Sequence, residues 1–226
     1  MNIALFGDHI SEIESSVKEA GFTIVQNNPE IVLSYGGDGT FLKSEHAFPE
    51  VPKVLIKNSA TCRLCTELPL DEVLSRIKYR DYSLFEVIKL KVSASDKEWH
   101  AINDAVLHNR DPRRAIRFSL SLNGRAIVND AIGDGVVIAT SLGSTGYFKS
   151  ITQKTFNSGV GIAFNNTSNR IDPIITEEEG FDVTLQIKRG PGVVYADNQD
   201  GEALINDGDE VRVMLSSEKA QVLTFD

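Results

Sequence analysis

Apolar and polar residues alternate along the first third of the chain in a way that predicts strands and helices in turn. Three short apolar runs have the length of buried strands: Asn2 to Phe6, Ile31 to Tyr35 and Lys53 to Ile56. Apolar residues recur at helical spacing in three further segments: Ile10 to Ala20, Phe41 to Ala47 and Leu70 to Ile77. Strands that alternate with helices form parallel sheets covered by helices, so residues 1–80 are predicted to be an α/β domain.

The pattern changes near residue 81, where strand-like runs follow one another with turn residues such as Asn123-Gly124 between them. The runs are Phe85 to Val92, Trp99 to His108, Ala115 to Leu122, Ala126 to Asn129, Gly135 to Thr140, Phe181 to Ile187, Val193 to Tyr195, Glu202 to Ile205, Glu210 to Leu215 and Gln221 to Phe225. Residues 81–226 are therefore predicted to be a β-rich second domain, whose last strand is free to return to the first domain.

Composition narrows the class of protein. With 226 residues, 41% hydrophobic and 24% charged, the chain has the values of an ordinary globular protein. No apolar run approaches the roughly 20 residues that cross a bilayer, and the start of the chain lacks the basic segment of a secretory signal, so we expect a cytoplasmic protein. The net charge of -9 argues against a nucleic-acid or membrane partner.

A glycine-rich turn, Gly36-Gly37-Asp38-Gly39-Thr40, directly follows the run that ends at Tyr35. Glycine allows a bound group to approach the backbone, and the first amides of the following helix attract anions, so the turn is typical of a phosphate site. A carboxylate there repels phosphate unless a cation lies between them or the carboxylate performs chemistry. The alternative is structural, with Asp38 as a helix N-cap.

Both cysteines lie in Cys62-Arg63-Leu64-Cys65, which has the spacing of redox and zinc motifs. A structural zinc ion needs four ligands, and the chain has no second cysteine pair. We therefore expect two reduced thiols in a loop.

Two polar motifs belong to the predicted β-rich domain. Asn103-Asp104 interrupts a strand-like run, and because neighbouring residues of a strand point to opposite faces, the pair shares a ligand only at a bulge or a strand end. The apolar run after Asp134 ends in hydroxyls and glycines from Thr140 to Tyr147. This segment is either a loop that caps a helix or a set of small groups suited to the riboses and amide of a dinucleotide.

In this order and at roughly this spacing, the glycine turn, the Asn-Asp pair and the Gly143-Ser144-Thr145-Gly146-Tyr147 stretch resemble the NAD kinase family, from Met1 to about Glu210. The glycine turn alone is shared with diacylglycerol and sphingosine kinases and, more loosely, with 6-phosphofructokinases. The later stretch makes the resemblance specific. It implies a phosphofructokinase-like α/β domain followed by a β-rich domain.

The resemblance implies phosphoryl transfer from ATP, or from polyphosphate in some members, to the 2′-hydroxyl of the adenosine ribose of NAD, forming NADP. Asp38 would be the base that faces this hydroxyl. The donor phosphates would lie on Gly36, Gly37, Gly39 and Thr40, with Mg²⁺ or another divalent metal bound through the phosphates and not by direct protein ligands. The implied NAD-binding residues are Leu64, Asn103, Asp104, Asp134, Thr145, Gly146, Tyr147 and Ser150.

Further expectations come from the family pattern. Asp200-Gly201 looks like its late Asp-Gly, and family members commonly form dimers or tetramers, which implies a homo-oligomer. The chain departs from the pattern where the segment from Asn58 to Cys65 replaces Asn-x-Gly-x-Leu-Gly-Phe, whose aromatic ring lies against the adenine. Leu64 can still pack on a purine, and Asp104 replaces the commoner Glu.

Two other functions remain open from the sequence. One is a kinase for another alcohol, a lipid or a sugar, that uses the same donor turn. The other is an NAD(P)-binding protein without catalysis, for which the altered loop is the motivation.

Overall fold

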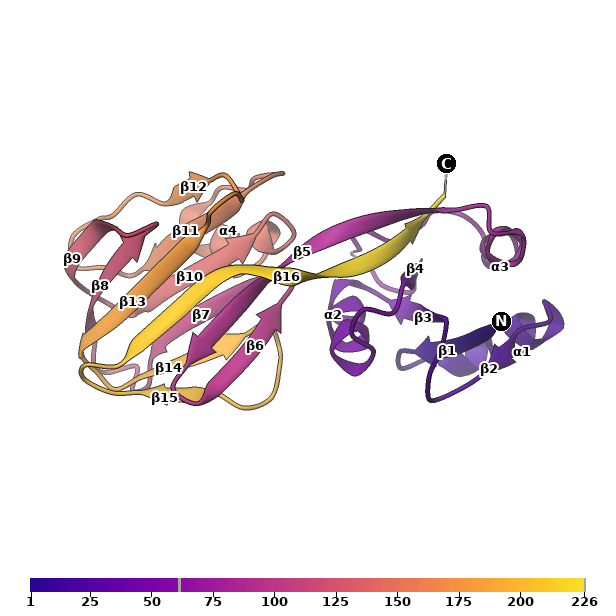
Figure 1. The fold of residues 1–226 in the computed structure, drawn as a ribbon, viewed down its shortest axis with the longest axis horizontal. Helices are drawn as coiled ribbons and strands as arrows, with labels where there is room; N and C mark the ends of the chain where they lie inside the picture. The colour runs from indigo at the N-terminus through magenta and orange to yellow at the C-terminus, as the bar shows by residue number, and fades with distance from the viewer. Residues whose placement is uncertain (61, 226) are drawn as a thin grey trace. The chain divides into compact units, whose positions relative to one another are not determined.

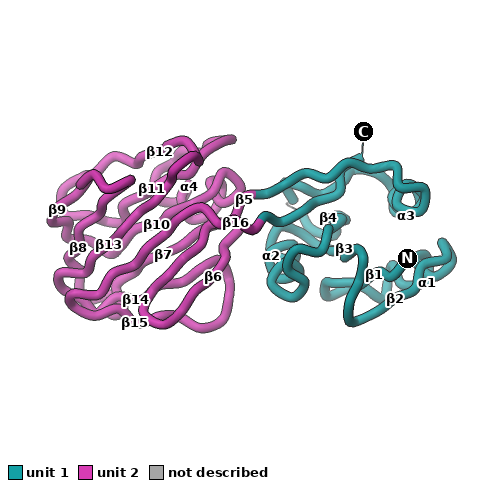
Figure 2. The backbone as a smooth tube through the Cα atoms, in the orientation of Figure 1, with its two compact units in different colours: residues 1–87, 219–226 teal, residues 88–218 magenta. Residues whose placement is uncertain are grey.

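The computed structural model describes residues 1–60 and 62–225 of the chain. It divides into two compact units, which are drawn in different colours in Figure 2. Unit 1 comprises Met1–Val87 and Lys219–Asp226, and unit 2 comprises Ile88–Glu218. The chain passes from one unit to the other within two long strands, β5 (Ser83–Ala94) and β16 (Glu210–Thr224).

Unit 1 contains a parallel sheet in the order β2-β1-β3-β4, which the end of β16 extends beside β4 (Figure 1). Its first four strands are β1 (Asn2–Phe6), β2 (Thr23–Ile24), β3 (Ile31–Gly36) and β4 (Lys53–Lys57). The predicted α/β class of the N-terminal region is confirmed. The strand order reverses beside β1, because β2 lies on one side of it and β3 on the other. Ligands of open α/β sheets bind at the carboxyl ends of strands at such a point.

Helices cover both faces of this sheet. Alternate strand residues such as Ile31 and Leu33 share one core with Val17 of α1 (Glu14–Glu19) and Ile77 of α3 (Leu70–Tyr79). The intervening strand residues point the other way, toward α2 (Asp38–Ala47), whose Phe41 and Leu42 are buried. The single helix predicted for Ile10 to Ala20 was wrong, because a 3-10 turn at Ile10–Glu12 precedes α1 and no side chain caps it.

A buried ion pair fixes the orientation of α2. Glu45 of this helix and Lys53 at the start of β4 form the pair, and both side chains are almost completely shielded from solvent. Lys53 also donates a hydrogen bond to the carbonyl oxygen of Phe48, just after the helix. Because removal of either charge would leave the other one buried without its counter-ion, the pair holds the helix that begins at Asp38 in one place.

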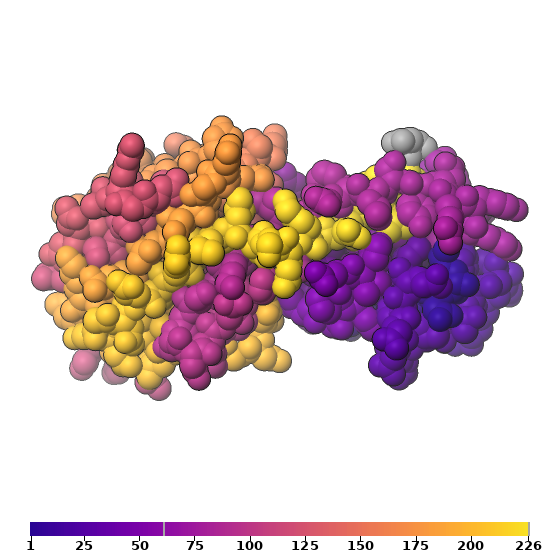
Figure 3. Space-filling model, viewed as in Figure 1, coloured from indigo at the N-terminus to yellow at the C-terminus, as the bar shows by residue number. Residues whose placement is uncertain are grey.

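Unit 2 contains two antiparallel sheets. The first has the order β16-β13-β8-β9 and includes the hairpin of β5 and β6; β16 and β13 run side by side in Figure 1, and Figure 3 shows the atoms of β16 at the surface, in yellow. The second has the order β12-β11-β10-β7-β14-β15. The strands are β6 (Lys97–Ala101), β7 (Asp104–Asn109), β8 (Ile116–Leu122), β9 (Arg125–Gly133), β10 (Gly135–Thr140), β11 (Val160–Asn165), β12 (Ile174–Thr176), β13 (Asp182–Arg189), β14 (Gly192–Ala196) and β15 (Ala203–Ile205).

The main core of unit 2 lies between its two sheets. Phe118 and Leu120 of β8 share it with Val136 and Ile138 of β10. The opposite face of β10 packs on α4 (Tyr147–Thr152), through a second cluster that includes Phe148. Because β10 is buried on both faces, its sequence is an unbroken apolar run, and the predicted β-rich class of this region is confirmed.

One predicted strand of unit 2 was wrong. The run from Trp99 to His108 forms two strands, β6 and β7, with Ile102 and Asn103 between them. Asn103 therefore directly precedes β7, and Asp104 is the first residue of this strand. At a strand end two neighbouring polar side chains can face the same ligand.

No helix among residues 1–60 and 62–225 combines the length and apolar character needed to span a bilayer.

Candidate active site

The glycine turn of unit 1 joins β3 to α2. Asp38 is the first residue of the helix, and Gly37 before it is extended, with a φ of -132°. The Oγ1 atom of Thr40 accepts a hydrogen bond from the backbone N–H of Gly37 at 3.4 Å. A Cβ atom at Gly36 would overlap the Thr40 side chain, whereas at Gly39, among the described residues, nothing beyond its chain neighbours and its own helix comes within 4 Å of a Cβ. Gly36 is therefore required for packing, and the side of the turn at Gly39 is open.

A further glycine, at the end of β1, also belongs to this turn. Gly7 has a φ of 139°, and a Cβ there would collide with the carbonyl oxygen of Tyr35 and lie 3.6 Å from Cγ2 of Thr40. The backbones at the carboxyl ends of β1 and β3 are thus in close contact, at the point where the strand order reverses. Gly7 was not predicted as part of the site, although a glycine directly after the first predicted strand is visible in the sequence.

The carboxylate of Asp38 is held by the loop that follows the carboxyl end of β4. Its Oδ1 atom accepts a hydrogen bond from the backbone N–H of Arg63 at 2.9 Å. Arg63 lies between Cys62 and Cys65, which form a disulfide with their Cα atoms 5.5 Å apart. The prediction of two reduced thiols was wrong. The spacing of the cysteines along the chain excludes a zinc site, but it does not show whether their Cα atoms come close enough for a disulfide.

A cavity of about 500 Å³ adjoins this part of unit 1. It opens at the carboxyl ends of β3 and β4, beside the residue that precedes the glycine turn. Its lining includes Lys57, which forms an ion pair with Glu67 at 3.7 Å, and Tyr35, whose hydroxyl donates a hydrogen bond to Glu12.

In unit 2 the Asn103-Asp104 segment is held by one carboxylate. The Oδ2 atom of Asp197 accepts a hydrogen bond from the N–H of Ile102 at 2.7 Å, and its Oδ1 atom accepts from the N–H groups of Asn103 at 2.7 Å and Asp104 at 3.0 Å. Asp197 itself has a φ of 49°, a conformation that Asp and Asn tolerate better than most residues. The backbone of the predicted NAD-binding pair is therefore fixed from the end of β14.

The Thr140 to Tyr147 segment packs directly on the same backbone. The hydroxyl of Thr140 donates to the carbonyl oxygen of Ile102 at 2.6 Å, and the N–H of Thr140 donates to the carbonyl oxygen of Asn103 at 2.9 Å. A Cβ atom at Gly143 would collide with the backbone of Asn103. The two polar motifs of the second domain, 37 residues apart from Asn103 to Thr140, thus form one site in unit 2.

Tyr147 and Asp134 belong to this site as well. The phenol oxygen of Tyr147 accepts a hydrogen bond from the side-chain amide of Asn165 at 2.8 Å. Burial and the neighbouring charge of Asp134 raise the pKa of this phenol. The Asp134 carboxylate in turn accepts hydrogen bonds from the amides of Asn109 at 3.0 Å and Asn166 at 2.8 Å. Sequence reasoning did not find these three asparagines, which are brought together by the pairing of β7, β10 and β11.

The remaining predicted residues of unit 2 lie at the surface. Thr145, Gly146 and Ser150 are exposed, and the hydroxyl of Ser150 donates to the carbonyl oxygen of Tyr147 at 2.8 Å. Asp200 is exposed too, whereas Asp197, three positions earlier, makes the contacts with the Asn103-Asp104 segment. The sequence analysis missed Asp197, although an Asp-Asn pair directly after a strand-like run was visible.

Asp104 gives unit 2 a measurable pH dependence. Burial, and after it the charge of Asp197, raise the pKa of this carboxyl from 3.8 to about 7. The folded state therefore keeps a proton that the unfolded chain releases, so the contribution of Asp104 to stability is greatest below about pH 4 and falls as the pH rises to 7. We expect a loss of about 2 to 4 kcal/mol from this group.

The measurement is urea unfolding between pH 5 and 8, for the wild type and for Asp104→Asn. The variant should lose most of this pH dependence, because its amide does not ionise. An equal slope in both proteins would exclude Asp104 as the source.

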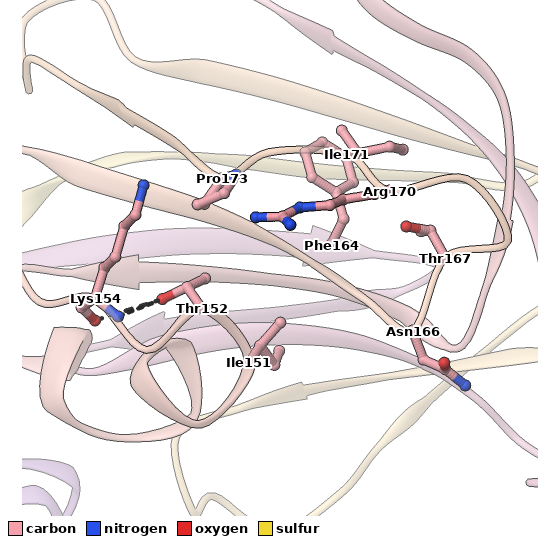
Figure 4. Close-up of a pocket in the computed structure, with 9 residues that line it drawn as sticks. All are labelled: Ile151, Thr152, Lys154, Phe164, Asn166, Thr167, Arg170, Ile171 and Pro173. Carbon is pink, nitrogen blue, oxygen red and sulfur yellow. Dashed lines mark hydrogen bonds between the residues drawn. The ribbon is translucent and has the colours of Figure 1, made fainter.

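A second cavity, of about 290 Å³, lies in unit 2 at the end of α4 (Figure 4). Two cationic side chains, Lys154 and Arg170, approach it, and Phe164 contributes an apolar wall. Arg170 is 91% exposed and forms an ion pair with Asp172 at 3.5 Å. None of the predicted site residues lines this cavity, so we assign it no part in the reaction.

The described residues provide no group of three or more His, Cys, Asp or Glu side chains that could hold a metal ion. The side-chain oxygens at the glycine turn are those of the Asp38 carboxylate and the Thr40 hydroxyl. So few oxygens fit Mg²⁺ only as an ion held mainly by the phosphates of a ligand, because Mg²⁺ prefers a full octahedron of oxygen neighbours.

Comparisons with known proteins point to one family. A family model described as the ATP-NAD kinase C-terminal domain matches residues 102–225. The NAD kinase of Thermoplasma acidophilum is 27% identical and aligns with 96% of this chain and 81% of its own length. The NAD kinase of Saccharolobus islandicus is 28% identical, with coverages of 96% and 88%.

Two solved structures share the fold. One is an NAD kinase from Archaeoglobus fulgidus in complex with ATP, with a TM-score of 0.82, 20% identity and coverage of 100% of this chain and 94% of that one. The other is the yeast NADH kinase in complex with NADH, with a TM-score of 0.79, 15% identity and coverages of 100% and 84%.

Proposed function

Because the chain belongs to the ATP-NAD kinase family and phosphorylates NAD with ATP, we propose that Asp38 is the base that activates the 2′-hydroxyl of the adenosine ribose. The observation that carries this proposal is the place of Asp38. It is the first residue of α2, in a glycine turn at the reversal of strand order. No other carboxylate lies in that turn.

A ribose hydroxyl is a poor nucleophile while it is neutral. A positioned carboxylate that accepts its proton as the oxygen attacks phosphorus contributes about 10²- to 10⁴-fold in rate. The remaining acceleration comes from alignment of the two substrates and from neutralisation of charge on the transferred group.

The donor phosphates of ATP bind at Gly36, Gly37, Gly39 and Thr40. The N–H groups at the start of a helix attract an anion, and the open surroundings of a Cβ at Gly39 support this place for the phosphates. A divalent metal, Mg²⁺ in the first instance, would be held through these phosphates and would supply neutralisation of their negative charge. Thr40 adds a hydroxyl at the same place.

NAD binds in unit 2, on the site formed by Asn103, Asp104 and the Thr140 to Tyr147 segment. The Asn103 amide offers donors and an acceptor to the adenine edge, and the Asp104 carboxyl faces ribose hydroxyls. Tyr147 and Asp134 contact the nicotinamide half. Thr145, Gly146 and Ser150 complete the contacts of this site, and Leu64 of unit 1 is the purine contact that the family pattern implies.

The direct test is to incubate the pure protein with ATP, MgCl₂ and NAD and to detect NADP with an NADP-specific dehydrogenase. Parallel reactions with polyphosphate and with NADH define the donor and the acceptor. Formation of NADP supports the proposal. Phosphorylation of a sugar or a diacylglycerol in place of NAD would favour the other alcohol kinases, and NAD binding by calorimetry without turnover would favour a non-catalytic protein.

We also propose that the enzyme is a cytoplasmic homo-oligomer. Family membership supports this assembly, and β9 at the edge of its sheet exposes Ile127, which is 42% accessible. Light scattering on the purified protein tests the assembly, with a dimer or a tetramer expected and a monomer as the contrary result.

A further inference from the structure

The disulfide-closed segment from Cys62 to Cys65 touches the proposed base directly. The N–H of Arg63 donates to the Oδ1 atom of Asp38 at 2.9 Å, across 25 positions of sequence. The Sγ atom of Cys65 lies 3.9 Å from the carbonyl oxygen of Gly36, so the same segment contacts the glycine turn twice.

The far end of the segment is anchored to the sheet. The N–H of Thr66 donates to the carbonyl oxygen of Leu55 at 2.9 Å, and Thr66 forms a parallel bridge with Ile56 of β4. Cys65 is therefore fixed by its neighbour, whereas Cys62 is fixed by the disulfide. Arg63 lies between these two fixed points.

We propose that the Cys62–Cys65 disulfide positions Asp38 for catalysis by holding the Arg63 N–H against one oxygen of its carboxylate. The two cysteines are thus positioning residues for the reaction, an inference that rests on the proposed role of Asp38. The hydrogen bond to Oδ1 restricts rotation of the Asp38 side chain and leaves Oδ2 to accept the proton. Catalytic side chains need such support, because small errors in position are costly.

Opening the disulfide should release this hydrogen bond. A dithiol reductant breaks the S–S bond in two exchange steps; the cystine gains two electrons and two protons, and the reductant becomes a cyclic disulfide. The chain has only these two cysteines, so any effect of reduction on the protein's thiols belongs to this pair.

The experiment compares steady-state kinetics of the oxidised and the reduced enzyme. We expect reduction to lower kcat by about three- to tenfold, which is the net worth of one hydrogen bond. The KM for ATP should change by less than about twofold, because the phosphates bind to N–H groups of the turn, whereas Cys65 contacts only the carbonyl oxygen of Gly36. Reoxidation should restore kcat. The Cys62→Ser and Cys65→Ser variants should have the kcat of the reduced enzyme, and adding the reductant should not change it.

Three results would overturn the inference: equal kcat in both states, a change confined to KM, or two titratable thiols in the enzyme purified without reductant. A second readout is independent of activity. By NMR, exchange of the Arg63 amide proton should be faster after reduction and in oxidised Asp38→Ala. If Asp38→Asn keeps full activity but the amide behaves as expected, the proposed base is wrong while the disulfide contact stands.

Discussion

Replacement of Asp38 by asparagine is expected to lower kcat by about 10²- to 10⁴-fold while the fold and ATP binding persist. Asparagine has nearly the same shape, and its Oδ1 atom can still accept the N–H of Arg63, which now lies at 2.9 Å from the carboxylate. It cannot accept a proton from a ribose hydroxyl. The loss therefore falls on the chemical step alone.

Single-turnover measurement of NADP formation, with ATP affinity from calorimetry, checks this prediction. Asp71→Asn is the matched control, because Asp71 is also an acid in the first turn of a helix of unit 1 but lies exposed on α3. A kcat for Asp38→Asn within about threefold of the wild type would rule out the base role.

Replacement of Asp197 by asparagine is expected to raise the KM for NAD by about tenfold or more and to destabilise the protein by about 2 kcal/mol. Its carboxylate now accepts three backbone N–H groups. An amide would place its own NH₂ group against one of these donors. Asparagine tolerates the φ of 49° at this position, so the change tests the hydrogen bonds and not the backbone conformation.

NAD-dependent kinetics and urea unfolding of Asp197→Asn give the answer, with Asp200→Asn as control, since Asp200 is exposed nearby. A second signature separates positioning from general damage. The charge of Asp197 helps to raise the pKa of Asp104, so the pH dependence of unfolding should move to lower pH in the variant. Unchanged KM and an unchanged pH profile would show that the Asn103-Asp104 segment does not depend on Asp197.

Local sequence predicted the parts of the fold that local geometry determines. The glycine turn was recognisable because strand, glycines and helix follow one another within about ten residues, and β10 was recognisable because burial on both faces requires a continuous apolar run. The break of the predicted strand at Ile102 was not recognisable, because the Asp197 carboxylate that accepts the N–H of Ile102 lies 95 positions further along the chain.

The residues of the candidate site divide in the same way into those that a local motif indicates and those that distant segments contribute. Asn103, Thr140 and Tyr147 could be named from a motif, but what supports them could not. Asn165 reaches Tyr147 through the pairing of β11 with β10, and Arg63 reaches Asp38 from a loop that a disulfide closes. Spacing along the chain carries no information on such long-range contacts, so the supporting groups became visible only in the structure.

The return of β16 to unit 1 has a consequence for folding during synthesis. Val222 pairs with Lys53 of β4, and the buried Leu223 completes the core that begins with Ile3. Unit 2 is one continuous segment, Ile88–Glu218, whereas the core of unit 1 lacks Leu223 until residues 219–226 have been made. Unit 1 therefore completes its sheet only after unit 2 has been translated, although its first strand is made first. Chains truncated after Glu218 should accordingly keep protease resistance in unit 2 and lose it in unit 1.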